Sequence, residues 1–167
     1  TREPVAAGSP GEIAVKGPGL FAEYLNNPEL TARSFNAEGY FHTGDCGRID
    51  ADGLLTFLGR LKDQMKVGGE NVSALEVEAF LATHPAVKLA QVVALPDERY
   101  GEVPAAFIEL NSGTRLTEAE VITYCQGQIA RFKIPRHVRF VTEWPMSTTK
   151  IEKYKLRQRL TEELRLT

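Results

Sequence analysis

Two long apolar segments constrain the fold more than any other feature of this sequence. Residues 87–95 and 103–110 are rich in Val, Leu, Ile and Ala. Apolar runs of this length are typical of strands that lie buried in the middle of a sheet. The segments therefore predict two central strands with helices packed on them.

Signals for helices lie before and after these segments. Ser73 precedes a run of helix-forming residues, and Glu76 follows three positions later. Thr117 and Glu120 repeat the same spacing, which is the pattern of a capping box at a helix start. We therefore expect two helices, one beginning after Ser73 and one after Thr117.

The order of elements after residue 61 predicts the fold class. Short strands are expected around 62–67 and 70–72, a further strand at 136–141, and an amphipathic helix at 153–164. Helices and strands in this order indicate an α+β unit with helices on a sheet. We expect a small three-stranded sheet in this part of the chain.

The first 60 residues have a different character. The pattern predicts short strands and small helices, namely strands at 13–16, 47–49 and 54–58 and helices near 20–25 and 29–35. The strand-like segment GEIAVKG requires a partner strand. We therefore expect two domains, with residues 1–60 as the β-rich end of a larger N-terminal domain and residues 61–167 as a separate C-terminal domain.

Composition excludes several classes of function. The formal net charge is −2, with both signs interleaved, which does not favour a nucleic-acid partner. The sequence contains no apolar run of transmembrane length, and its three histidines do not have the spacing of metal ligands. Cys46 and Cys125 are far apart in sequence, so we expect no disulfide framework and a cytoplasmic location.

Four motifs occur in a fixed order along the chain. They are YFHTGD (40–45), GRLKDQMKVGGENVSALEVE (59–78), ARFKIPRHV (130–138) and PMSTTKIEKYKLR (145–157). Together they resemble the later motifs of the acyl-adenylate-forming superfamily, which includes the AMP-forming acyl-CoA synthetases. The resemblance implies that an acid and ATP form an acyl-AMP and pyrophosphate, after which the acyl group passes to CoA. It also implies that the C-terminal domain is a mobile lid.

The resemblance assigns nucleotide binding to Asp45 and Arg60. A carboxylate accepts hydrogen bonds from two neighbouring hydroxyls, which a ribose provides. A guanidinium group pairs with ribose or phosphate oxygens. From the residues alone, an Asx-turn is favoured over a ribose contact for Asp45, and a solvated surface charge is the usual role of a lone arginine such as Arg60.

Three further residues are implied to serve the lid. Lys62 matches the hinge position, where the backbone rotates between two lid arrangements. Gly68 and Gly69 match the glycines that line the channel through which the pantetheine arm of CoA reaches the acyl-AMP. Without the resemblance, Lys62 is an ordinary surface lysine and the glycine pair is a turn between short strands.

Lys150 matches the catalytic lysine of the superfamily. An ammonium group can orient the substrate carboxylate and neutralise charge on the α-phosphate during adenylation. The superfamily usually has Gly before this lysine, whereas this chain has Thr149, which as a β-branched residue resists positive φ. The residues alone also allow Lys150, Lys153 and Lys155 to form one basic helix face.

The sequence has no Gly/Ser/Thr-rich phosphate loop and no acyl pocket. We therefore expect the C-terminal portion of an ATP-dependent acid–CoA ligase, for a fatty or aromatic acid, which is inactive without its own N-terminal domain. The expected ligands are ATP/AMP, CoA and a carboxylic acid, with Mg²⁺ held by the missing domain. Two alternatives are an adenylation domain that loads a carrier protein and a non-catalytic interaction module that reuses the lid fold.

Overall fold

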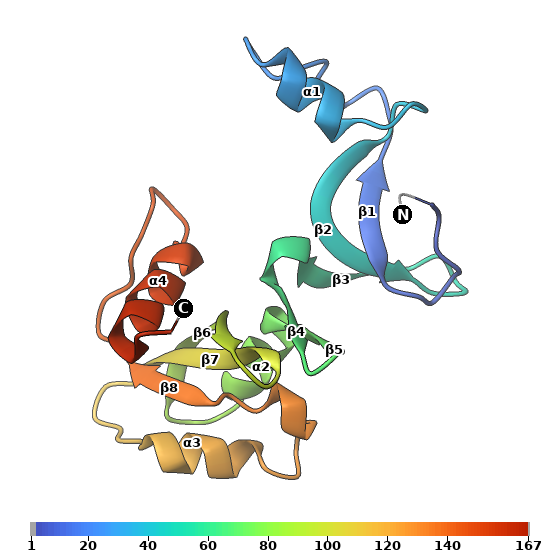
Figure 1. Cartoon of the computed structure of the whole chain (residues 1–167). Coiled ribbons are helices and arrows are strands. Elements are labelled where there is room, and N and C mark those ends of the chain that lie inside the picture. Colours follow the sequence, from blue (N-terminus) through green and yellow to red (C-terminus); the bar gives the residue numbers. More distant parts are fainter. Residues whose placement is uncertain (1–2, 167) are drawn as a thin grey trace. The chain divides into compact units, whose positions relative to one another are not determined.

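A computed structural model describes residues 3–166, and Figure 1 shows the course of the chain. Residues 1, 2 and 167, at the ends of the two expected domains, lie outside the described residues. The chain forms two compact units that divide between Lys62 and Asp63. The two units are described separately.

The first unit contains a three-stranded antiparallel sheet and one short helix. The sheet has the order β1 (Gly11–Val15), β2 (Phe41–Ile49) and β3 (Leu55–Arg60), and the helix is α1 (Pro28–Ser34). The helix begins as expected, because Asn27 Oδ1 accepts a hydrogen bond from the N–H of Leu30 at 3.0 Å and Pro28 occupies the first turn. The β2–β3 turn contains Gly53 at φ +81°.

The helix that we expected near residues 20–25 does not form, because these residues adopt turns and bends. Phe21 instead packs edge-to-face against Tyr24 and Phe41, with ring centroids 4.9 Å and 5.1 Å away. Phe35 also lies against Phe21, at 5.6 Å. Aromatic contacts with residues from α1 and β2 therefore fix a segment that is too short to hold a helix by itself.

The second unit contains a five-stranded sheet, in place of the three strands expected. Its strands are β4 (Gln64–Val67), β5 (Glu70–Ser73), β6 (Val87–Asp97), β7 (Gly101–Leu110) and β8 (His137–Phe140). The order is β5-β4-β7-β6, and β8 pairs with β7 in the parallel direction. The short strands expected around 62–67 and 70–72 form as the hairpin of β4 and β5, which joins the sheet at a single pairing, Val67 with Gly101, and so raises the number of strands from three to five.

Three helices cover this sheet and confirm the α+β class. They are α2 (Ala74–Leu81), α3 (Glu118–Cys125) and α4 (Lys153–Leu164), with short 3₁₀ turns η1 (Leu61–Asp63) and η2 (Arg131–Lys133). Thr117 and Glu120 form the expected capping box at the start of α3. Ser73 Oγ accepts from the N–H of Glu76 at the start of α2. Within residues 3–166, the helices lack the length and apolar character that a bilayer span requires.

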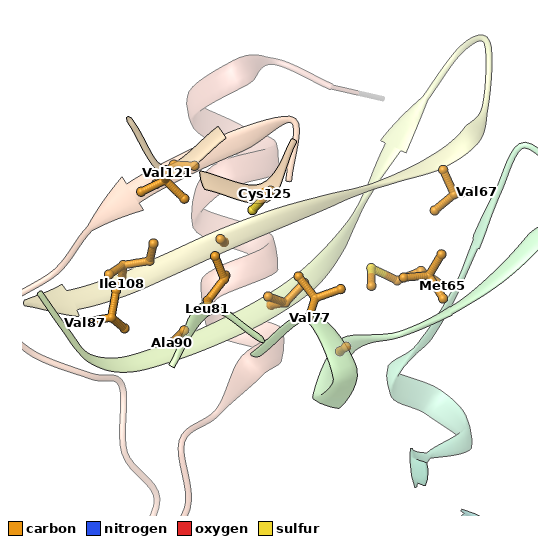
Figure 2. Packing of buried hydrophobic residues seen from close by; sticks show 14 residues of the cluster. Met65, Val67, Val77, Leu81, Val87, Ala90, Ile108, Val121 and Cys125 are labelled. Carbon is orange, nitrogen blue, oxygen red and sulfur yellow. The ribbon is translucent and has the colours of Figure 1, made fainter. Parts of the chain in front are cut away.

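The residues of β6 and β7 alternate between two hydrophobic clusters on opposite faces of the sheet. The first cluster joins β6 and β7 to α2 and α3, and Figure 2 shows Val77, Leu81, Val121 and Cys125 in it. The second cluster joins the same strands to α4. It contains Val93, Leu95, Val103, Ala105, Phe107, Leu156 and Leu160. Both strands are largely apolar because helices cover both faces.

Candidate functional site

Asp45 and Arg60 lie opposite each other where β2 pairs with β3. Arg60 Nε is 2.8 Å from Asp45 Oδ1, and the arginine side chain is half exposed. The two groups form an ion pair, but Asp45 Oδ1 is buried and receives no properly directed hydrogen bond from the described residues. Since a carboxylate oxygen is a strong acceptor, Asp45 retains the capacity to accept a hydroxyl group of a ligand.

The backbone before Asp45 makes a turn that requires glycine. Gly44 has φ +72°, and a Cβ added there would meet no atom within 4 Å. Thr43 Oγ1 accepts a hydrogen bond from the N–H of Asp45 at 3.0 Å and donates one to the carbonyl of Ile13 at 2.7 Å. The positive φ of Gly44, rather than a lack of space, explains this glycine.

The structure places the Asx-turn of this region at Asp50. Asp50 Oδ1 accepts hydrogen bonds from the N–H groups of Asp52 at 3.0 Å and Leu54 at 2.8 Å. Asp45 lies within β2, and the side chain that bonds its own N–H belongs to Thr43. The local turn role considered for Asp45 from the sequence is therefore filled by other residues.

Glu12 and His42 support the same turn, and sequence reasoning did not assign either of them. Glu12 Oε1 accepts from the N–H of Gly44 at 3.0 Å, and Glu12 Oε2 lies 3.0 Å from His42 Nδ1. His42 Nε2 is buried and has no hydrogen-bond partner among the described residues. β2 thus carries two buried polar atoms, His42 Nε2 and Asp45 Oδ1, that form no hydrogen bond with the described residues. Glu12 reaches Gly44 and His42 only because β1 pairs with β2.

Lys62 lies in η1, the single 3₁₀ turn between β3 and β4, and its side chain is exposed. The two compact units meet in sequence directly after it. An exposed residue in a short turn can change its backbone angles without disrupting a core. The hinge role of Lys62 stays a prediction.

Gly68 and Gly69 form the two-residue turn between β4 and β5. Their φ angles are +59° and +94°, which suits a tight hairpin. The N–H of Gly68 donates to the carbonyl of Tyr100 at 2.8 Å, and a Cβ on Gly68 would lie 3.2 Å from the Tyr100 ring. The turn is therefore packed against the β6–β7 hairpin through Tyr100.

Two arginines flank the Tyr100 ring, and sequence reasoning did not single out this cluster. The guanidinium carbons of Arg99 and Arg136 lie 5.1 Å and 5.5 Å from the ring centroid. Arg136 Nη1 donates to Asp97 Oδ2 at 2.9 Å, and half of its side chain is exposed. Backbone and arginine contacts hold the pKa of Asp97 below its usual range. The cluster offers cationic and aromatic surface beside Gly68.

Lys150 lies in a narrow loop that ends at α4. The N–H and the Oγ of Ser147 both donate to the carbonyl of Lys150, at 2.9 Å and 3.2 Å. Met146 and Ile151 form a β-bridge behind them. Thr149 is not among the described non-glycine residues with positive φ, so its β-branch is compatible with this loop. The backbone of Lys150 is fixed and its side chain is exposed.

The three lysines of this region have different surroundings. Lys153 Nζ lies 2.6 Å from Glu78 Oε1, and Lys155 Nζ pairs with Glu152. Within the part of the chain that the structure describes, Lys150 makes no ion pair. The lysines therefore do not form one solvated basic face, and Lys150 is the cation that remains available to a ligand.

The predicted site residues fall into separate groups. Asp45 and Arg60 are brought together in the first unit, and the glycine turn and Lys150 lie in different loops of the second unit, one between β4 and β5 and one between β8 and α4. Within residues 3–166, no three His, Cys, Asp or Glu side chains gather as a group that could hold a metal ion.

Comparison with known proteins identifies the family. Residues 76–151 match the AMP-binding enzyme C-terminal domain. A medium-chain acyl-CoA ligase, ACSF2 of Danio rerio, is 40% identical over 99% of this chain. Residues 76–151 therefore belong to the AMP-binding enzyme C-terminal domain family, and the chain is similar to this acyl-CoA ligase along nearly its whole length. The 2-methylpropanoate–CoA ligase CCL4 of Humulus lupulus, another relative, is 43% identical over 88% of the chain.

A solved adenylate-forming enzyme shares the structure as well. The chain superposes on ATP-bound MatB from Rhodopseudomonas palustris with a TM-score of 0.88 and 36% identity, over 95% of this chain. The apo crystal structure of MatB gives a TM-score of 0.66 over the same share. This chain spans 28% and 27% of the lengths of the two curated relatives and 32% of MatB.

Proposed function

We propose that this chain is the C-terminal portion of an AMP-forming acid–CoA ligase. The reaction converts a carboxylic acid, ATP and CoA into acyl-CoA, AMP and pyrophosphate through an acyl-adenylate. The observation that carries the proposal is the likeness to two named CoA ligases along nearly the whole chain. Of the fatty or aromatic acids expected as substrates, their names support the fatty acids, because they refer to a branched short-chain acid and to medium-chain acids.

Asp45 and Arg60 are proposed to hold the ribose of ATP and of the acyl-adenylate. The Asp45 carboxylate accepts hydrogen bonds from the two ribose hydroxyls, and Oδ1 is free of competing hydrogen bonds from the described residues. Arg60 holds the carboxylate in place from the neighbouring strand through their ion pair. Glu12 fixes the Gly44 turn that presents Asp45.

Lys150 is proposed to act in the adenylation step. Its ammonium group bridges the attacking carboxylate and an oxygen of the α-phosphate, which orients one and neutralises charge on the other. Two features support this role: the side chain is exposed, and the neighbouring lysines are engaged in ion pairs whereas Lys150 is not. The clamp from Ser147 fixes the backbone from which the side chain extends.

Lys62 is proposed as the hinge between residues 1–60, the end of the large domain, and residues 61–167, the lid. The ATP-bound and apo crystal structures of MatB superpose on this chain with TM-scores of 0.88 and 0.66, and this difference between two structures of one neighbour is in keeping with the proposal. A hinge lets one lid serve adenylation and then thioester formation.

Gly68 and Gly69 are proposed to border the path of the pantetheine arm of CoA. The Tyr100 cluster extends this proposal, because an aromatic ring and two guanidinium groups suit the adenine and phosphate groups of CoA. Its position beside the Gly68 turn supports a single binding path for the pantetheine arm and the nucleotide part.

The remaining requirements are proposed to come from the protein's own N-terminal domain. These are the phosphate loop, the acyl pocket and the groups that hold Mg²⁺, which supplies charge neutralisation to the phosphates when bound. A cytoplasmic location also stays a prediction, supported by two buried cysteines that are both free thiols.

The test is pyrophosphate release and acyl-CoA formation by the full-length gene product and by the 167-residue chain. Each is given ATP, Mg²⁺, CoA and a panel of short, medium-chain and aromatic acids. We expect activity only from the full-length protein. Sustained turnover by the 167-residue chain would contradict the fragment proposal, and an inactive full-length protein with every acid would contradict the ligase proposal.

A further inference from the structure

A partly buried ion pair connects the start of α4 to α2. Lys153 Nζ donates to Glu78 Oε1 at 2.6 Å, although the two residues are 75 positions apart in sequence. Glu78 Oε1 also accepts from the backbone N–H of Val92 in β6 at 2.7 Å. Lys153 Nζ further lies 4.0 Å from Asp63 Oδ2 in η1. One ammonium group thus meets residues from two other elements.

The environment makes this pair more than a surface contact. Only 11% of the Glu78 side chain and 22% of the Lys153 side chain are exposed. Burial raises the pKa of Glu78, and the Lys153 charge and the hydrogen bonds from Lys153 and Val92 oppose that rise. When one partner of such a largely covered ion pair is removed, the charge of the other is left uncompensated, and that side chain no longer holds its place.

Lys153, one partner of this ion pair, lies three residues after Lys150. The loop between β8 and α4 is anchored before Lys150 by Trp144, whose Nε1 donates to Glu109 Oε2 at 2.7 Å. It is anchored after Lys150 by Ile151, which packs against the α4 cluster, and by Lys153. Glu152 N–H donates to the carbonyl of Pro145 and closes the loop. Lys153, the first residue of α4, therefore anchors the end of this loop.

We propose that Lys153 and Glu78 are positioning residues that hold the Lys150 loop in its reactive place. Asp63 extends the connection to η1, the turn that contains Lys62. This inference rests on the proposed function only for its kinetic consequence. The structural part, that Lys153 and Glu78 hold the loop of residues 145–152, stands independently of the reaction.

The experiment compares Lys153→Met, Lys153→Arg and Glu78→Gln in the full-length gene product. Glu78→Gln keeps the shape and an acceptor for the Val92 N–H, so it removes the charge pair with little change in packing. The matched control is Lys133→Met. The Lys133 side chain is 22% exposed, as that of Lys153 is, and it pairs with Glu76 of α2, the helix that contains Glu78. Lys133 extends from η2, however, and not from the start of α4.

Two readouts are measured. The first is hydrogen–deuterium exchange of residues 145–152, where Ser147 and Glu152 have bonded amides. We expect faster exchange in Lys153→Met and Glu78→Gln and no change in Lys133→Met. The second is kcat for each half-reaction. We expect adenylation to fall about 10- to 100-fold while thioester formation from supplied acyl-AMP is retained, since misplacement by about 1 Å has effects of this size.

The outcomes are distinct. If Lys153→Arg shows exchange and adenylation kcat close to the wild type, the result supports positioning by a cation. Unchanged exchange in Lys153→Met overturns the proposal, and so does an equal loss in both half-reactions, which indicates a general loss of folding. If the wild-type protein forms no adenylate, the proposed function fails, and the exchange data still decide whether the pair holds the loop.

Discussion

Asp45 and Arg60 are register partners across β2 and β3, with Arg60 Nε 2.8 Å from Asp45 Oδ1. Their pairing depends on an irregularity in the register immediately after Cys46, where one residue of β3 is skipped. Gly59, which lies beside Arg60, has φ +108°. This irregularity is a bulge in β3, and it places Arg60 within reach of the Asp45 carboxylate.

Replacement of Asp45 by Asn tests the ribose contact. The amide preserves size but removes the charge that strengthens hydrogen bonds from ribose hydroxyls. Because hydrogen bonds to charged groups contribute about 1.5–3 kcal/mol, we expect KM for ATP to rise by about 10- to 100-fold. The measurement is ATP-dependent pyrophosphate release by the full-length protein. Asp52→Asn, in the exposed β2–β3 turn, is the control and should leave KM unchanged.

Replacement of Gly44 by Ala tests whether the turn depends on backbone conformation. A Cβ there meets open space, so the cost arises from φ +72° alone. We expect the free energy of unfolding to fall by about 1–2 kcal/mol. Gly44→Asn should lose less, because Asn tolerates the left-handed region. Chemical denaturation gives both values, and equal losses for Ala and Asn would contradict the backbone explanation.

Local signals in the sequence predicted the parts of the fold that local chemistry decides. Asn27 before Pro28, and Thr117 with Glu120, mark helix starts, and the structure confirms both. The expected helix 153–164 also forms with the same limits. In each case a side chain close in sequence bonds the first backbone N–H groups or the apolar spacing fixes one face.

Contacts between distant residues could not be predicted in this way. The expected helix near residues 20–25 is replaced by an aromatic contact between Phe21 and Phe41, and the hairpin of β4 and β5 enters the sheet through one pairing with Gly101. The motifs indicated Asp45 and Arg60, but not Glu12, because only the pairing of β1 with β2 brings Glu12 to Gly44.

Replacement of Lys150 by Met tests the adenylation role. The change removes the ammonium group but keeps a long side chain on a backbone that Ser147 holds. We expect kcat for acyl-AMP formation to fall by about 100-fold or more, as for the loss of one electrostatic stabiliser in other active sites. Thioester formation from supplied acyl-AMP should persist. A large loss in that second half-reaction would contradict a role confined to adenylation.

The buried thiol of Cys125 makes stability depend on alkaline pH. The residue has no exposed surface, and burial raises the pKa of the thiol from its ordinary value of 9.0 to about 11. Because the raised pKa favours the protonated folded state, the stabilisation is complete below pH 9.0 and is lost as pH rises toward about 11. Urea unfolding between pH 7 and 11 measures this loss of stability.

The control is Cys125→Ala, which should be less stable at every pH, since it leaves a small cavity in the cluster with Val121. Subtracting the variant from the wild type removes the titration of Lys and Tyr. A difference that stays constant from pH 9 to 11 would show that the thiol does not contribute.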